Sequence, residues 1–161
     1  MVKILIIRGN SGCGKSSCAQ RLRQQLPGQT LLVSQDVVRR EMLAANDHVK
    51  TPAIPLMKNL VSWGSTHAQT VILEGILKRQ VYQDFLIELR REFQSDLISV
   101  YFDVSFETTE RRNREKLYPF SHDQLVSWWQ PADLLGDETL IFTDQDSLNT
   151  CVTKLRQLLM A

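Results

Sequence analysis

The sequence predicts an α/β fold in which helices cover a mostly parallel β-sheet. Short apolar runs alternate with longer amphipathic segments along the chain, which is the pattern of α/β proteins with a parallel sheet. A glycine-rich loop, Gly9–Ser16, follows the first apolar run and precedes the first amphipathic segment. Ligands of such sheets bind beyond the carboxyl ends of the strands, so we expect the chemistry in the segments that follow them.

Residues 2–67 are expected to contain two strands and three helices. Its first apolar run is almost continuously aliphatic, as in a strand that is buried on both faces. The first helix is expected to end before Pro27 and Gly28, which are typical helix stops. The expected elements are strands at 2–7 and 30–33 and helices at 16–26, 36–43 and 54–67.

Residues 70–160 continue the alternation of strands and helices. The apolar residues Val81, Phe85 and Leu89 recur at helical spacing, which predicts an amphipathic helix. The expected strands are 70–73, 97–102 and 139–142, and the expected helices are 81–93, 107–116, 121–129 and 147–160.

Length and composition predict one ordinary globular domain over residues 1–161, with 43% hydrophobic and 23% charged residues. The net charge of +1 does not favour a general nucleic-acid binder, although a local basic patch leaves that open. We expect no membrane span and a cytoplasmic location, because Ile4–Ile7 is too short to cross a bilayer and Arg8 interrupts a signal-peptide core. Three cysteines without framework spacing predict no disulfide scaffold.

The glycine-rich loop has the spacing of a phosphate loop: Gly9, four residues, then Gly14-Lys15-Ser16. Such a loop between a strand and a helix points backbone amides at an anion, and the helix N-terminus adds partial positive charge. We expect Lys15 to act catalytically on the β- and γ-phosphates of ATP and the Ser16 hydroxyl to bind Mg²⁺. The expected ATP-binding residues here are Gly9, Asn10, Ser11, Gly12, Cys13 (through its backbone), Gly14, Lys15, Ser16 and Ser17.

Asp36 follows the second expected strand and should face the same crevice as the phosphates. A carboxylate there can accept the proton of an attacking hydroxyl, which makes Asp36 the candidate general base. Arg39 lies about one helical turn further on and could hold a substrate anion. The alternative is that Asp36 only caps the next helix.

Two acids at strand ends compete for the magnesium side of the site. Glu74 ends the third expected strand and Asp103 the fourth. We favour Glu74 for metal and substrate contact because Gly75, which follows it, permits a tight turn or the close approach of a ligand.

Four basic residues, Arg111, Arg112, Arg114 and Lys116, crowd into six positions. They are either the solvated face of a helix or part of a lid, over roughly residues 111–131, that closes on the nucleotide. In the lid interpretation Arg112 and Arg114 are catalytic, and Arg112 and Lys116 contact ATP. The tryptophan pair near the end of this segment is expected to pack and anchor the lid.

Together these residues resemble the small P-loop kinases, in particular the kinase domain of polynucleotide 5'-hydroxyl kinases and chloramphenicol phosphotransferase. The resemblance runs from Val2 to about Phe142, and only its phosphate loop is highly specific. It implies a three-layer α/β/α fold of the P-loop NTPase type with a five-stranded parallel sheet of order 2-3-1-4-5 and a helical lid. It also implies that Asp36 is the base, that Arg39 contacts substrate and that adenine lies near Thr143–Asp144; Arg112-Asn113 and Lys116 match the family's lid pattern.

The resemblance leaves the acceptor open. Polynucleotide kinases carry two adjacent acids where this chain has Asp36-Val37, and an Asp is more usual than Glu74 at the third strand end. We therefore expect an ATP-dependent kinase that acts on a hydroxyl of a small molecule. The alternatives are a polynucleotide 5'-hydroxyl kinase and a non-catalytic nucleotide-binding protein or slow NTPase, and the sequence does not indicate an oligomeric state.

Overall fold

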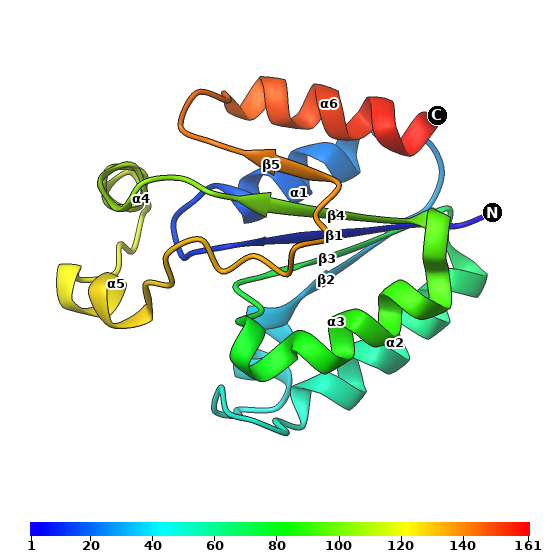
Figure 1. Cartoon of the computed structure of the whole chain (residues 1–161), viewed down its shortest axis with the longest axis horizontal. Coiled ribbons are helices and arrows are strands. Elements are labelled where there is room, and N and C mark those ends of the chain that lie inside the picture. Colours follow the sequence, from blue (N-terminus) through cyan, green and yellow to red (C-terminus); the bar gives the residue numbers. More distant parts are fainter.

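The computed structural model describes residues 1–161 and contains one parallel sheet with the strand order β2-β3-β1-β4-β5. Figure 1 shows α1 and α6 on one face of this sheet and α2 and α3 on the other. The predicted three-layer architecture and strand order are therefore confirmed. No helix is long and apolar enough to cross a membrane.

Each predicted strand and α-helix but one corresponds to an observed one, with ends that differ by a few residues. The strands are β1 (Lys3–Gly9), β2 (Thr30–Ser34), β3 (Thr70–Gly75), β4 (Leu97–Phe102) and β5 (Leu140–Phe142). The α-helices are α1 (Lys15–Gln25), α2 (Ala53–His67), α3 (Arg79–Phe93), α4 (Phe106–Arg114), α5 (His122–Trp128) and α6 (Leu148–Met160). The exception is the helix expected at 36–43, which is a short π-helix, Val37–Met42.

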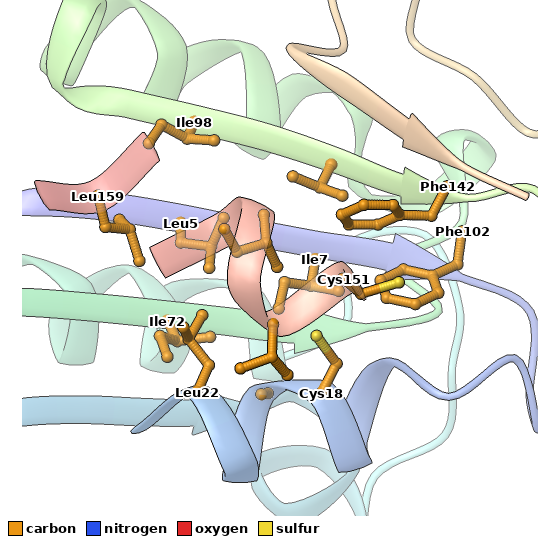
Figure 2. Packing of buried hydrophobic residues seen from close by; sticks show 14 of the residues in the cluster. Leu5, Ile7, Cys18, Leu22, Ile72, Ile98, Phe102, Phe142, Cys151 and Leu159 are labelled. Carbon is orange, nitrogen blue, oxygen red and sulfur yellow. The ribbon is translucent and has the colours of Figure 1, made fainter. Parts of the chain in front are cut away.

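Alternation along the central strand divides the core into two layers. Ile4 and Ile6 of β1 pack in the cluster on the α2–α3 side, whereas Leu5 and Ile7 pack in the cluster on the α1–α6 side. Figure 2 shows the cluster on the α1–α6 side, where Leu22 of α1 packs against aliphatic side chains of the strands. Because β1 is buried on both faces, the loop that follows it is held by a rigid base.

The carboxyl ends of the strands carry the features that the sequence singled out. Helices α4 and α5 lie beyond these ends rather than against the sheet, and the chain then returns along residues 129–139 to β5 (Figure 1). The amino and carboxyl termini lie together at the opposite end. The sheet therefore presents the phosphate loop, the ends of β2 and β3 and the lid segment at one edge.

Candidate active site

The phosphate loop connects β1 to α1 and needs glycine at specific positions. Gly14 has a φ of 101° directly before α1, a conformation that side-chain-bearing residues rarely adopt. A Cβ on Gly9 would lie 2.8 Å from Sγ of Cys13 and 3.0 Å from Cβ of Phe102. Nζ of Lys15, a residue only 7% exposed, donates to the carbonyl oxygen of Asn10 at 3.1 Å. The loop thus holds its ammonium group in place before any anion is bound.

Glu74 reaches the phosphate loop, whereas Asp103 does not. The Ser16 hydroxyl donates to Oε2 of Glu74 at 3.0 Å, and Glu74 is buried at the end of β3. Asp103 is exposed, and neither acid is among the residues that line the cleft described below, so the contact with Ser16 is what distinguishes Glu74. A hydroxyl and a carboxylate side by side are hard oxygen donors that fit Mg²⁺, which proteins usually hold through one or two carboxylates and the substrate phosphates. The geometry therefore favours Glu74.

Asp36 follows β2 and does not serve as a helix cap. Its side chain makes no capping hydrogen bond to the π-helix that it precedes, and it lines the same cleft as Lys15 and Ser16. Oδ1 of Asp36 lies 3.5 Å from Nη2 of Arg39 and 3.7 Å from Nε of Arg40. Asp36 and Arg39 therefore lie on the same face of this segment, as expected, and Arg40 lies beside them.

The basic residues between Arg111 and Lys116 do not all face the same way. Some face the cleft, as the lid interpretation predicts, and others lie on a solvated helix face. Arg112 donates from Nη1 to the carbonyl oxygen of Cys13 in the phosphate loop, and both Arg112 and Lys116 line the cleft. Desolvation lowers the pKa of the Lys116 ammonium, and the nearby charge of Lys15 lowers it further. In contrast, the Arg114 side chain is 73% exposed and pairs with Glu110 on the outer surface of α4. Of the two predicted catalytic arginines, only Arg112 therefore lies at the cleft.

These elements enclose one cleft of about 550 Å³. Phosphate-loop residues line one part of it, Asp36 another and the lid a third. Its apolar residues are Phe102, Phe120, Leu148 and Cys151, so the cleft reaches the start of α6, a few residues beyond the expected Thr143–Asp144 position. The lining residues are Ser11, Gly12, Gly14, Lys15, Ser16, Ser17, Asp36, Phe102, Arg112, Glu115, Lys116, Phe120, Asp146, Leu148 and Cys151.

Two asparagine contacts hold the lid, and the sequence did not predict either. The Asn10 side chain donates to the carbonyl oxygen of Gln130 at 2.7 Å and accepts from its backbone N–H at 2.8 Å. Asn113 makes the same pair of bonds with the backbone of Phe120, at 2.8 Å and 3.0 Å. Both asparagines are buried. An asparagine amide is the natural partner for one backbone N–H and one C=O, but sequence spacing gives no signal for such distant pairs.

Arg8 anchors the segment that returns from the lid to the sheet. Its side chain is fully buried, donates from Nε to the carbonyl oxygen of Leu77 at 3.1 Å and pairs with Asp133 at 3.0 Å. Its guanidinium also lies 5.5 Å from the ring centre of Tyr101 and 3.7 Å from Glu138. From sequence Arg8 was only an interruption of an apolar run, yet its ion pairs tie β1 to the end of the lid.

The fold and the phosphate loop define an α/β protein of the P-loop type. Residues 4–126 match the model of the AAA domain family, and the chain belongs to that family. A search of the curated proteins found no match to the chain.

Solved structures with the same fold are numerous. APS kinase from Mycobacterium tuberculosis, in complex with AMPPNP and APS, has a TM-score of 0.73 and 19% identity, with 99% of this chain and 98% of that chain covered. A gluconokinase from Sinorhizobium meliloti 1021 has a TM-score of 0.68 and 14% identity, covering 98% and 91%. Shikimate kinase from Bacteroides thetaiotaomicron has a TM-score of 0.64 and 14% identity, covering 99% of each chain. These likenesses establish the shared fold.

Proposed function

We propose that this protein is an ATP-dependent kinase that transfers the γ-phosphate to a hydroxyl group of a small molecule. The observation that carries the proposal is the position of Asp36 on the same cleft as Lys15 and Ser16. A phosphate loop alone is equally consistent with a protein that only binds ATP and with one that hydrolyses it. A carboxylate facing that loop from the neighbouring strand end adds the group that an alcohol acceptor needs.

The residues in and beside the cleft have distinct roles in this reaction. Asp36 accepts the acceptor proton while the acceptor oxygen bonds to the γ-phosphorus and the bond to the bridging oxygen of ADP breaks. Lys15 and Arg112 neutralise charge that develops on the phosphoryl oxygens. Ser16 and Glu74 would hold Mg²⁺, which would supply positive charge to offset that of the phosphates. Phe102 and Leu148 form an apolar wall for the nucleobase, close in sequence to the expected Thr143–Asp144 loop in the case of Leu148.

The fold comparisons support a small acceptor. Three proteins that share the fold over nearly their whole length are named as kinases of APS, gluconate and shikimate, and the structure of the first is in complex with AMPPNP and APS. A polynucleotide 5'-hydroxyl acceptor is the second candidate, because Arg39, Arg40 and Lys116 surround Asp36 with positive charge. The net charge of +1 does not favour a general nucleic-acid binder.

The test is a phosphoryl-transfer screen with labelled ATP across sugars, nucleosides, antibiotics and a 5'-hydroxyl oligonucleotide. Asp36→Asn should lower transfer to the acceptor about 10²–10⁴-fold, the usual contribution of a general base, and leave ATP affinity unchanged. Asp84→Asn is the matched control, because Asp84 is exposed on α3 away from the cleft. Wild-type transfer by Asp36→Asn would exclude the general-base role, and ATP binding without transfer to any acceptor would favour a non-catalytic nucleotide-binding protein.

A further inference from the structure

Arg40 connects the two sides of the cleft. Its Nε lies 3.7 Å from Oδ1 of Asp36, the acid after β2. Its guanidinium carbon lies 6.0 Å from the ring centre of Phe120 and 5.6 Å from that of Trp128, and both rings belong to the lid segment. A guanidinium within about 6 Å of an aromatic ring centre is attracted by the ring electrons. Arg40 therefore contacts the proposed base and the lid at the same time.

The lid presents these rings on a rigid support. Asn113 fixes the backbone of Phe120 with two hydrogen bonds. The Phe120 ring meets the Trp128 ring edge-on, with centres 4.9 Å apart. Nζ of Lys116 lies 5.1 Å from the centre of the Phe120 ring, so this ring contacts a cation of the lid as well as Arg40. Because its backbone is held, the ring pair is a fixed docking point for the Arg40 guanidinium.

Arg40 is not explained by packing of the core. Its side chain is 44% exposed, whereas the neighbouring Arg39 side chain is 13% exposed and donates to the carbonyl oxygen of Ala45. Arg39 is thus held by its own segment. Arg40 instead reaches across to residues 80 and 88 positions further along the chain.

We propose that Arg40 is a positioning residue that latches the lid over Asp36 through its cation–π contacts with Phe120 and Trp128. The lid opens only when Arg40 leaves this ring pair, so Arg40 sets the access of acceptor and water to the proposed base. The part of the inference that concerns acceptor access rests on the proposed function. The part that concerns lid closure does not, because the contact exists whatever the reaction is.

The first test measures lid closure without any reaction. In a Trp63→Phe, Trp129→Phe background, Trp128 is the only tryptophan and its fluorescence reports the ring that Arg40 covers. Arg40→Leu should increase acrylamide quenching of Trp128 about two- to fivefold, the factor expected from loss of an exposed cation–π contact. Arg40→Lys should recover part of this effect, since it keeps the charge but not the flat guanidinium. Arg23→Leu, on the exposed surface of α1, should not alter quenching.

The second test separates a latch from a merely structural residue. Arg40→Leu should increase acceptor-independent ATP hydrolysis relative to phosphoryl transfer by about the same two- to fivefold factor, with unchanged ATP affinity and thermal stability. Unchanged Trp128 quenching in Arg40→Leu would overturn the latch even if the protein is a kinase. Increased quenching in a protein that transfers phosphate to no acceptor would support the latch and reject the proposed function.

Discussion

The Ser16 hydroxyl donates a 3.0 Å hydrogen bond to Oε2 of Glu74. Ser16 lies in the first turn of α1, and Glu74 lies one residue before the end of β3, opposite Ile7 of the central strand. This contact joins the phosphate loop to the neighbouring strand end with two oxygen donors of the kind that Mg²⁺ prefers. The contact also distinguishes Glu74 from Asp103 as the candidate magnesium ligand. From the sequence alone, both acids were expected at strand ends.

The first prediction is that Glu74→Gln weakens Mg²⁺-dependent nucleotide binding. The amide removes the negative charge but keeps the size of the side chain. We expect the Mg²⁺ concentration for half-maximal binding to rise about 10–100-fold, as when partners of a metal site are replaced. Calorimetry with ATP across a Mg²⁺ series measures this. Asp103→Asn is the control and should behave as wild type; the opposite ranking of the two variants would assign the metal to Asp103.

The second prediction concerns the lid arginines. Arg112 contacts the phosphate loop and lines the cleft, whereas Arg114 is exposed and pairs with Glu110. Arg112→Leu should therefore lower phosphoryl transfer about 10²–10³-fold, the usual loss when one charge-stabilising donor is removed. Arg114→Leu should stay close to wild type, because an exposed ion pair contributes little. Steady-state kinetics of both variants decide between them, and an equal loss in both would mean that the lid closes in another arrangement.

The third prediction is that the thiols of Cys18 and Cys151 react slowly in the native protein at mildly alkaline pH. Burial raises the pKa of Cys18 to about 12 and that of Cys151 to about 11. In the unfolded chain a thiol ionises near its ordinary pKa of about 8.5. At that pH both thiols are still protonated in the folded protein. At pH 8 the two cysteines should react with a disulfide reagent at least about 100-fold more slowly than in the urea-unfolded chain, measured by mass spectrometry of labelled peptides.

The same pKa shifts set the sign of a stability change. A group whose pKa is raised by folding binds more protons in the folded state, so stability is constant below the unfolded pKa and falls above it. Urea unfolding should therefore show the free energy of unfolding decreasing from about pH 8.5 toward pH 11. Rapid native labelling at pH 8, or no loss of stability over this range, would contradict the buried, protonated state of these thiols.

The fold could be predicted because its signals are local. The apolar run of β1, the helix stop at Pro27 and the glycine spacing before Lys15 each lie within one short segment. The same is true of Asp36 and Glu74, since a strand end is visible in the pattern and parallel strands bring their ends to one edge. The short helix after β2 was predicted only in outline, because nothing in its sequence distinguishes a π-helix from an α-helix.

The contacts that hold the lid could not be predicted because they join distant residues through ordinary hydrogen-bonding groups. Arg8 and Asp133 are 125 positions apart, and Asn10 and Gln130 are 120 apart. A basic residue in a strand and an asparagine in a loop have many possible partners, and only the folded backbone selects one. For the same reason the sequence could not separate Arg112 from Arg114, which lie on different sides of one helix.

The fourth prediction is that Asn10 fixes the end of the lid to the phosphate loop. Asn10→Ala removes both partners of the Gln130 backbone, whose N–H and C=O are bonded to the Asn10 amide at 2.8 Å and 2.7 Å. Leaving such groups without partners costs about 1–3 kcal/mol. Amide hydrogen exchange at Gln130 should therefore accelerate by about one to two orders of magnitude, and urea unfolding should show a destabilisation of similar size.

Two variants in the same loop separate this role from general damage to the phosphate loop. Asn10→Asp keeps an acceptor for the Gln130 N–H but turns a carboxylate oxygen toward the Gln130 carbonyl oxygen, so it should restore little of the protection. Ser11→Ala alters the adjacent residue without removing a contact to the lid and should leave exchange at Gln130 unchanged. If Asn10→Ala weakened ATP binding but left exchange at Gln130 as in the wild type, Asn10 would act on the nucleotide alone. Faster exchange confined to residues near Gln130 would instead identify the Asn10 amide as the fixed point about which the lid moves.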